Sequence, residues 1–248
     1  MNKPILYNGD CLEVMKQIQD KSIDMILCDL PYGTTACKWD VVIPFAPLWD
    51  QYKRIVKNNG AIALFASQPF SSKLLCSNIK GFKHEWIWRK EKGVGFQVAK
   101  YRPMQEHEHI LVFTRNGERV NYYPIKEKRE KIIKSKGARS KSGSCPLAHI
   151  SEQNYIYDTK YPTSIINFKR DKEKIHPTQK PVALLEYLIK TYTNDGETVL
   201  DNCMGSGSTG VACMNTGRNF IGIELDTNYF NIAESRINEA FSMQKKEV

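Results

Sequence analysis

Four consecutive residues combine three kinds of chemistry in one short turn. Asp29 offers a carboxylate that accepts hydrogen bonds. Leu30 and Pro31 form a rigid turn that exposes a carbonyl, and Tyr32 adds an aromatic face. The apolar run Ile23–Cys28 precedes them and predicts a buried strand, so these residues lie where a strand ends. A strand-to-turn boundary also uses Asp, Pro and Gly, so composition alone leaves a purely structural interpretation open.

A second candidate site is a glycine-rich loop further along the chain. Gly205, Gly207 and Gly210 fit the spacing G-x-G-x-x-G, in which backbone amides at a helix N-terminus approach a ligand because no Cβ intervenes. The run Thr198–Leu200 predicts a strand before the loop, and Ser208 is a candidate N-cap for a helix after it. A glycine-rich turn would match the same spacing, but the strand–loop–helix context favours a nucleoside-containing cofactor.

Charge around this loop favours one kind of cofactor. Asp201 lies at the mouth of the loop, where it would repel a pyrophosphate but suits the ammonium and sulfonium of S-adenosylmethionine. The predicted strand Phe220–Ile223 ends at Glu224, which is placed to bind ribose hydroxyls. Only residues 225–248 follow, too few for the further strands of a dinucleotide fold. We therefore disfavour an NAD-dependent oxidoreductase and expect the chain in front of the loop to complete the sheet.

Hydrophobic periodicity predicts the elements that must position these sites. A short strand at Ile5–Tyr7 precedes Asp10, which either caps the helix predicted at Cys11–Ile18 or reaches a ligand. An amphipathic helix at Phe45–Val56 is expected to end near Gly60. Further elements are predicted at Ala61–Phe65, Phe70–Asn78, Glu85–Trp88, His109–Phe113, the helix that begins at Pro181, and Tyr229–Phe241.

With these motifs in order, the chain resembles a known family. The tetrapeptide Asp29–Tyr32 resembles the D-P-P-Y motif of amino-group DNA methyltransferases, and the glycine-rich stretch resembles their cofactor motif. Because the tetrapeptide comes first and the cofactor loop last, the chain resembles the β group of N6-adenine and N4-cytosine enzymes. Leu30 stands where the family usually has proline. The resemblance implies a circularly permuted, Rossmann-like α/β fold with a mixed seven-stranded sheet, helices on both faces and a basic target-recognition insertion.

The resemblance also implies roles for individual residues. Asp29 and the carbonyl of Leu30 would accept the two N–H groups of an exocyclic amine, Pro31 would shape the turn, and Tyr32 would stack on a flipped base. S-adenosylmethionine is the implied cofactor. The residues implied to bind it are Asp10, Cys11, His176, Thr178, Lys180, Asp201, Gly205, Ser206, Gly207 and Glu224.

Two basic segments are candidates for contacts with DNA. Arg89–Arg102 mixes five basic residues with glycines and aromatics, which suits either phosphates and an extruded base or a plain surface hairpin. Arg115–Lys141 carries ten basic and three acidic residues, and Ser140–Ser144 reads as a mobile link. By resemblance we predict a target-recognition insertion at 115–172, between a catalytic half at 1–114 and a cofactor-binding half at 173–248. A solvated charged insertion is the alternative.

Composition limits the class of protein. The 248 residues carry a net charge of +9, which makes a polyanionic partner such as double-stranded DNA plausible. Seven cysteines without C-x-x-C spacing favour reduced thiols over disulfides or a zinc cluster, and His107 and His109 read as structural. No apolar run has the length of a signal peptide or membrane span, so we expect a cytoplasmic protein that needs no metal and no membrane. The oligomeric state stays open, and a homodimer is retained as one arrangement.

Several alternative activities remain or are set aside at this point. Aspartate at the first tetrapeptide position favours adenine N6 over cytosine N4, where serine is common. Methylation of cytosine C5 requires a Pro-Cys nucleophile, whereas this chain has only Cys145-Pro146 in the reverse order. RNA or protein-glutamine methylation usually places the cofactor loop first. A DNA-binding module without catalysis would have no need of Asp29 or Tyr32. The sequence does not indicate the target site, or whether a restriction endonuclease accompanies the protein.

Overall fold

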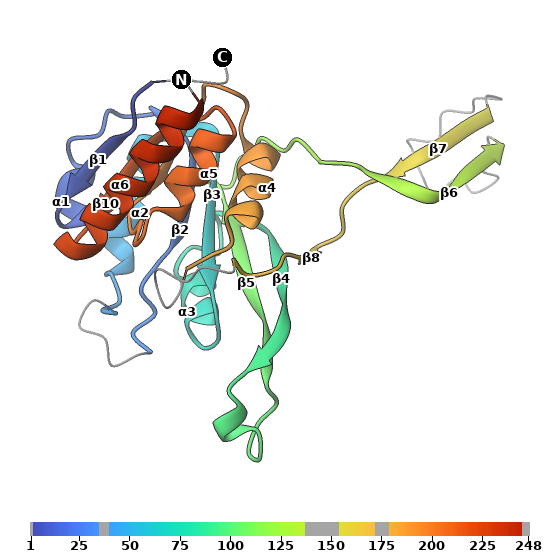
Figure 1. Cartoon of the computed structure of the whole chain (residues 1–248), viewed down its shortest axis with the longest axis horizontal. Helices are drawn as coiled ribbons and strands as arrows, with labels where there is room; N and C mark the ends of the chain where they lie inside the picture. Colours follow the sequence, from blue (N-terminus) through green and yellow to red (C-terminus); the bar gives the residue numbers. More distant parts are fainter. Residues whose placement is uncertain (1, 35–39, 137–153, 172–178, 245–248) are drawn as a thin grey trace. The chain divides into compact units, whose positions relative to one another are not determined.

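The computed structural model describes residues 2–34, 40–136, 154–171 and 179–244. Contacts divide the chain into two compact units, one of residues 1–123 and 164–248 and one of residues 124–163. The larger unit is an eight-stranded sheet with strand order β1-β10-β9-β2-β3-β5-β4-β8 and helices on both faces (Figure 1). This confirms the predicted Rossmann-like α/β class, and the sheet has eight strands where seven were expected because the three-residue β8 pairs with β4 at the edge.

The elements of the larger unit have the following bounds. The strands are β1 Ile5–Asn8, β2 Ile23–Asp29, β3 Val56–Ala66, β4 Phe82–Val94, β5 Gln105–Phe113, β8 Ile165–Asn167, β9 Thr198–Asp201 and β10 Asn219–Glu224. The helices are α1 Cys11–Met15, α2 Phe45–Ile55, α3 Phe70–Ser77, the 3₁₀ turn η1 Phe96–Val98, α4 Val182–Tyr192, α5 Ser208–Asn215 and α6 Thr227–Gln244.

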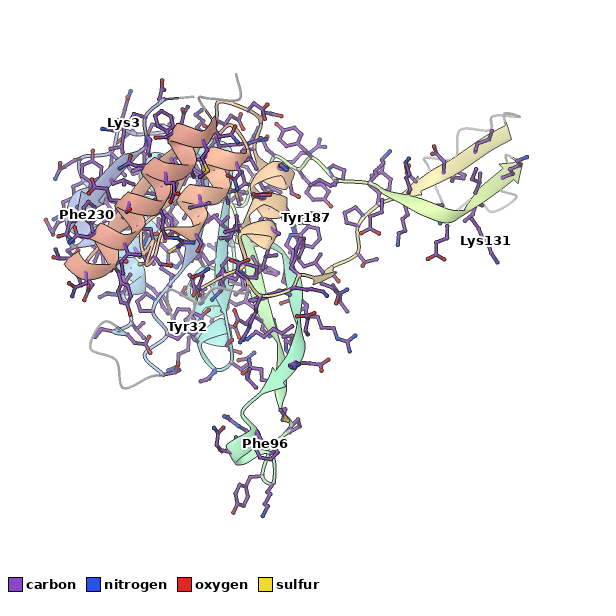
Figure 2. The ribbon with its side chains drawn as sticks, in the orientation of Figure 1. Lys3, Tyr32, Phe96, Lys131, Tyr187 and Phe230 are labelled. Carbon is purple, nitrogen blue, oxygen red and sulfur yellow. The ribbon has the colours of Figure 1, made fainter. Side chains whose placement is uncertain are left out.

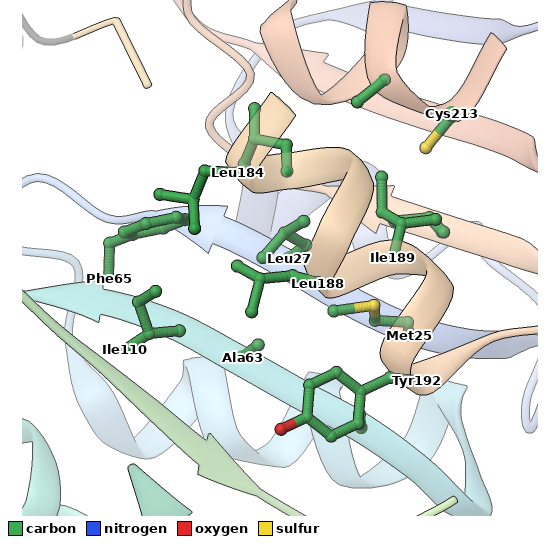
Figure 3. Close-up of a cluster of buried hydrophobic side chains, with 14 of the residues drawn as sticks. Met25, Leu27, Ala63, Phe65, Ile110, Leu184, Leu188, Ile189, Tyr192 and Cys213 are labelled. Carbon is green, nitrogen blue, oxygen red and sulfur yellow. The ribbon is translucent and has the colours of Figure 1, made fainter. Parts of the chain in front are cut away.

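Strand β2 is buried along most of its length, and apolar from Met25 to Cys28, because both faces of the sheet are covered. Its side chains alternate between the two hydrophobic clusters, as a strand's period of two requires. Met25 and Leu27 point toward α4, α5 and α6, whereas Ile26 and Cys28 point toward α1, α2 and α3. Figure 3 shows the first cluster, with side chains of α4 such as Leu188 packed over the strands. The core therefore fixes where β2 ends and where Asp29 lies.

The two ends of the chain interleave in the sheet. Strand β10 lies between β1 and β9, and β9 pairs with β2, all in parallel. The strands that flank the glycine loop are thus inserted between strands from the first 29 residues. This confirms the expectation that the preceding chain completes the sheet. Because β1, β2, β9 and β10 are parallel, their carboxyl ends meet at one edge.

Two local predictions require correction. Helix α2 does not end near Gly60, because β3 begins at Val56 directly after it and Gly60 lies inside that strand. A Cβ at Gly60 would lie 2.7 Å from the carbonyl oxygen of Asp24, so the glycine permits close strand approach rather than ending a helix. Strand β4 continues through Arg89 to Val94, which shortens the expected loop to a 3₁₀ turn and its flanks. Pairing with β5 resumes at Val94 after a shift of register between Arg89 and Val94.

The smaller unit is a two-stranded antiparallel sheet. Strands β6 (Glu127–Lys136) and β7 (Asn154–Lys160) pair with each other, Nζ of Lys126 lies 4.7 Å from the centre of the Tyr161 ring, and Nε of Arg129 donates to the carbonyl of Thr159. This unit spans fewer residues than the predicted insertion 115–172, because residues 115–123 and 164–172 belong to the larger unit. A role in target recognition stays a prediction, and the link expected at 140–144 lies outside the described residues.

Two predicted absences can be compared with the described part of the chain. No helix there combines the length and apolarity needed to cross a bilayer. No cluster of three metal-ligating side chains occurs among those residues. His107 and His109 make a ring contact, and Nδ1 of His109 lies 2.9 Å from Glu85, which matches their structural interpretation.

Candidate active site

A pocket of about 360 Å³ opens at the edge where the parallel strands end. The residues that close β2, β9 and β10 are all acidic and all line it, namely Asp29, Asp201 and Glu224. The structure therefore brings the tetrapeptide and the glycine loop, which are about 170 residues apart in sequence, to one cavity. The predicted residues that line the pocket are Asp10, Cys11, Asp29, Leu30, Pro31, Tyr32, Lys180, Asp201, Gly205, Ser206 and Glu224.

The carboxylate of Asp29 is held from two sides. The hydroxyl of Tyr32 donates to Oδ1 at 2.6 Å, and Nζ of Lys180 donates to Oδ2. Burial raises the pKa of Asp29, and Lys180 opposes that effect. Burial and the neighbouring Asp29 likewise raise the pKa of Tyr32, which keeps the phenol protonated as a donor. Asp29 is thus a fixed acceptor at the pocket wall.

The ring of Tyr32 is also oriented by packing. It stacks on Phe70, the first residue of α3, with ring centres 4.8 Å apart and planes inclined by 25°. One face of Tyr32 is therefore covered by the protein, a contact that the sequence did not reveal. Asp40 holds the turn that follows, since its two carboxylate oxygens accept the amides of Gly33 and Thr34 at 2.8 and 2.9 Å. Asp40 therefore helps to shape the turn that follows Tyr32.

The glycine loop differs in detail from its prediction. The amide of Gly205 donates to Oε2 of Glu224 at 2.8 Å, and that of Gly207 donates to the carbonyl of Met204 at 2.8 Å. Both amides are therefore used within the protein, contrary to the expectation that they face a ligand. Gly207 has a φ of 81°, and a Cβ there would lie 2.9 Å from Cβ of Ala233 on α6. The glycine allows the loop to turn and α6 to pack closely.

Ser208 was expected to cap α5, but the N-cap is Gly207 and Ser208 is the first helical residue. Its side chain is buried and lines the pocket, and within the part of the chain that the structure describes its Oγ has no hydrogen-bond partner. An unpartnered buried hydroxyl is costly unless a ligand or water satisfies it. Ser206 also lines the pocket, and its hydroxyl accepts from Nη1 of Arg236 at 3.1 Å.

Two carboxylates line the pocket beside the glycine loop. Asp201 is 3% exposed, and burial raises its pKa to about 6. Its Oδ1 accepts the amide of Cys203 at 3.1 Å. Burial also raises the pKa of Glu224, whose Oε1 accepts the amide of Asp226 at 2.9 Å. A cationic ligand would favour the charged form of both carboxylates.

Asp10 follows strand β1 and caps the next helix. Its Oδ1 accepts the amides of Leu12 and Glu13 at 2.8 and 3.3 Å, which makes it the N-cap of α1. Asp10 and Cys11 also line the pocket. His176 and Thr178, which the sequence assigned to the cofactor, lie outside the described residues.

Lys180 occupies a different position from the one expected for a ligand of the cofactor carboxylate. Its ammonium contacts two protein carboxylates, those of Asp29 and Glu108. Glu108 in turn pairs with Lys90 at 2.5 Å. Lys90 was grouped with the basic segment Arg89–Arg102, and nothing in the polar sequence around Glu108 indicated a buried carboxylate. Glu108 and Lys90 meet because β5 pairs with β4, and Lys180 reaches Glu108 from the segment before α4. The hydrophobic periodicity of each segment alone does not indicate such contacts.

Parallel strands that end on acidic residues, with the turn Asp29–Tyr32 beside a glycine loop, are the arrangement expected of an S-adenosylmethionine-dependent amino-methyltransferase. The chain belongs to the DNA methylase family, whose N6/N4 methyltransferase model matches residues 23–235. The order of its motifs places it in the β group of that family. It is thus a DNA amino-methyltransferase that uses S-adenosylmethionine.

Named relatives and solved structures agree with this assignment. The chain is 28% identical to "DNA adenine methyltransferase YhdJ" of Escherichia coli K12, over 98% of this chain and 85% of that protein. It is 26% identical to "Type II methyltransferase M.HpaI" of Haemophilus parainfluenzae, over 96% of this chain and 75% of that protein. The crystal structure of an M1.HpyAVI–SAM complex has a TM-score of 0.64 at 27% identity and covers 94% of this chain and 100% of that one. The "cytosine-N4-specific" PvuII DNA methyltransferase, at 15% identity, has a TM-score of 0.65, covers 98% of this chain and 93% of that one, and shares the fold.

Proposed function

We propose that this protein is a site-specific DNA adenine methyltransferase, which transfers a methyl group from S-adenosylmethionine to N6 of an adenine flipped out of duplex DNA. The observation that carries the proposal is the position of Asp29, an oriented acceptor at the wall of the same pocket as the glycine loop and Asp201. Extrusion is required because N6 cannot be reached while the base is stacked and paired.

The residues present fit the cofactor. The buried Asp201 carboxylate suits a cationic amino or sulfonium group, Glu224 suits ribose hydroxyls, and the unpartnered Ser208 hydroxyl suits a further polar group. S-adenosylmethionine, when bound, supplies an electrophilic methyl group on sulfur. The proposed cofactor residues from the sequence remain Asp10, Cys11, His176, Thr178, Asp201, Gly205, Ser206, Gly207 and Glu224, whereas the ammonium of Lys180 contacts Asp29 and Glu108 and is not retained in this set.

The catalytic turn addresses the poor nucleophilicity of the target amine. The lone pair of an exocyclic amino nitrogen is delocalised into the ring, so the nitrogen must become tetrahedral before it attacks. Asp29 and the backbone carbonyl of Leu30 would accept the two N–H groups and draw that lone pair toward the methyl group. Tyr32 would contact the base. Fixing both reactants in this way contributes up to roughly 7 to 11 kcal/mol by effective-molarity arguments.

Adenine is favoured over cytosine N4 by two observations. The tetrapeptide begins with aspartate, where N4-cytosine enzymes often have serine. A relative that matches 98% of this chain is named a DNA adenine methyltransferase. The cytosine-N4 enzyme among the structural neighbours is only 15% identical and supports the fold alone.

Contacts with duplex DNA are proposed for two basic elements. The β4–β5 hairpin ends in η1, where Phe96 and Tyr101 are 80% and 88% exposed beside Lys100 and Arg102. Figure 2 shows Phe96 at the tip of this hairpin, away from the core of the sheet. The unit of residues 124–163 is the proposed target-recognition element, with basic side chains such as Lys131 on an exposed ribbon.

The test is the identity of the methylated nucleoside. The protein is incubated with methyl-labelled S-adenosylmethionine and unmethylated DNA, and the DNA is then digested to nucleosides. We expect the label in N6-methyldeoxyadenosine. Label in N4-methyldeoxycytidine would retain the methyltransferase and overturn the choice of base, and label found only with an RNA substrate would overturn the proposed substrate.

A further inference from the structure

A chain of four charged side chains runs from the catalytic carboxylate into the sheet. Lys180 is hydrogen-bonded to Oδ2 of Asp29, and its Nζ lies 3.3 Å from Oε2 of Glu108. Oε1 of Glu108 lies 2.5 Å from Nζ of Lys90 on β4. The side chains of Lys180, Glu108 and Lys90 are only 9%, 13% and 6% exposed. Charges of alternating sign are thus stacked behind Asp29, with one member from each of four segments.

Stability alone gives little reason to keep such an arrangement. Removing several charges from water offsets most of their mutual attraction, and apolar side chains of similar volume would often stabilise a fold equally well. The environment is largely apolar, since Nζ of Lys180 also lies 5.0 Å from the centre of the Phe65 ring and Nζ of Lys90 lies 5.6 Å from that of Trp88. This row of charges ends on Asp29, the carboxylate proposed to orient the target amine, and that position suggests a catalytic reason for keeping it.

We propose that Lys180 is a positioning residue for methyl transfer, which compensates the charge of Asp29 and fixes its Oδ2, and that Glu108 and Lys90 hold Lys180 in place. The inference rests on the proposed function, because Asp29 is useful there only as an acceptor. A protonated Asp29 would donate a hydrogen bond and could not draw out the amine lone pair. Lys180 therefore serves the reaction through Asp29.

Several of the described groups around Asp29 affect its ionisation. Burial and the carboxylate of Glu108 disfavour its charged form, whereas Lys180 and the Tyr32 hydroxyl favour it. Asp201 on β9 and Cys28 on β2 also interact electrostatically with Asp29. Lys180 is the cation in direct contact, so its removal should raise the pKa of Asp29. Removal of the Glu108 charge should lower it.

The proposal therefore predicts opposite effects for two substitutions, Lys180→Met and Glu108→Gln. Lys180→Met removes the ammonium while keeping an unbranched chain, and we expect the acid limb of the methyl-transfer rate to move to higher pH by about one to three units, the usual effect of a contacting opposite charge. Glu108→Gln keeps the shape and should move the same limb to lower pH. A purely structural role for the network would lower the rate in both variants without moving the limb.

A measurement without turnover separates this inference from the proposed function. Protein with ¹³C-labelled aspartate carboxyl groups is titrated by NMR, and Asp29→Asn identifies the Asp29 signal. We expect that signal to titrate at higher pH in Lys180→Met and at lower pH in Glu108→Gln than in the wild type. If the titration shifts but no DNA is methylated, the proposed function fails and the pairing stands. An Asp29 titration unchanged by both variants overturns the inference.

Lys180→Arg is the matched control, because it keeps the positive charge. It should keep the wild-type acid limb, although its altered geometry lowers the rate.

Affinity for S-adenosylmethionine, measured by calorimetry, should change less than twofold in Lys180→Met. A large loss of cofactor affinity with an unmoved acid limb would instead assign Lys180 to the cofactor and overturn the inference. Should Lys180→Met fail to fold, the direction of the Glu108→Gln titration decides alone.

Discussion

The hydroxyl of Tyr52 on α2 donates to Oδ1 of Asn202 in the cofactor loop at 2.6 Å, across 150 residues of sequence. Both side chains are buried, at 0% and 2% exposure. Asn202 lies between Asp201 and the glycines and lines the pocket. The bond therefore ties the half of the chain that carries Asp29 to the glycine loop.

Tyr52→Phe should destabilise the protein while leaving the ring packing intact. The substitution leaves a buried amide oxygen without its donor, at a cost of about 1 to 3 kcal/mol. For a chain of this size each kcal/mol lowers Tm by roughly 2 to 4 °C, which a calorimetric melt would measure. Tyr7→Phe on the edge strand β1 is a comparison that removes a less buried hydroxyl. An unchanged Tm in Tyr52→Phe would mean that the link between the halves contributes no stability.

Affinity for S-adenosylmethionine should depend on pH through Asp201. Its pKa of about 6 means that it is ionised above pH 7 and protonated below pH 5 in the free protein. A cationic ligand favours the ionised form, so affinity is full above pH 7 and falls toward tenfold per unit below pH 6. Isothermal calorimetry across pH 5 to 8 measures this. Asp201→Asn should bind more weakly and lose this dependence, and a wild-type profile that is flat would refute the assignment.

Much of the fold was predictable because it follows from local patterns. The runs that form β2, β9 and α4 bury apolar side chains at the periods of strand and helix, and their positions were predicted to within a few residues. The ends of elements were less predictable. Val56 begins a strand directly after a helix, and no local signal marks that change, because pairing with β2 decides it.

The residues of the candidate site were likewise predictable where they lie in contiguous motifs, and less so where they depend on contacts between distant segments. Asp29 and Asp201 were found because motifs at strand ends are contiguous in sequence. The charged contacts behind Asp29 were not, since Lys180 reaches Asp29 from a segment far along the chain and Glu108 contacts Lys180 there. Internal use of the Gly205 amide was also missed, because it depends on where the side chain of Glu224 points.

The aromatic tip of the β4–β5 hairpin should contribute to DNA binding. Phe96→Ala and Tyr101→Ala each remove an exposed ring, and stacking of a base on an aromatic side chain is worth about 1 to 3 kcal/mol. We expect DNA affinity, measured by fluorescence anisotropy, to fall by roughly 5- to 150-fold in each variant, with unchanged cofactor affinity. Ile5→Ala is the control, because Ile5 is also exposed but begins β1 and so lies at the opposite edge from the pocket. Equal effects at Ile5 and Phe96 would contradict a specific contact.

The basic ribbon, residues 126–136 and 154–160, should give DNA binding its salt dependence. Neutralising Lys126, Lys128, Arg129 and Lys131 should weaken DNA binding and reduce the slope of log affinity against log salt by about 0.9 for each DNA phosphate that the protein no longer neutralises. Lys3, Lys53 and Lys190 form the control set, because each lies before the start of a parallel strand, away from the pocket edge. A slope that changes as much per charge in the control set would remove the ribbon from the interface.

Asp29→Ala is the most direct test of the central claim, which is that this carboxylate orients the target amine. The measurement is methyl transfer to duplex DNA from labelled S-adenosylmethionine in a single turnover, made beside calorimetric titrations of cofactor and DNA. We predict that the variant forms no N6-methyldeoxyadenosine while it binds the cofactor and DNA as the wild type does. Methyl transfer at the wild-type rate by Asp29→Ala would contradict the account, and loss of both bindings together would show that Asp29 is a structural residue instead.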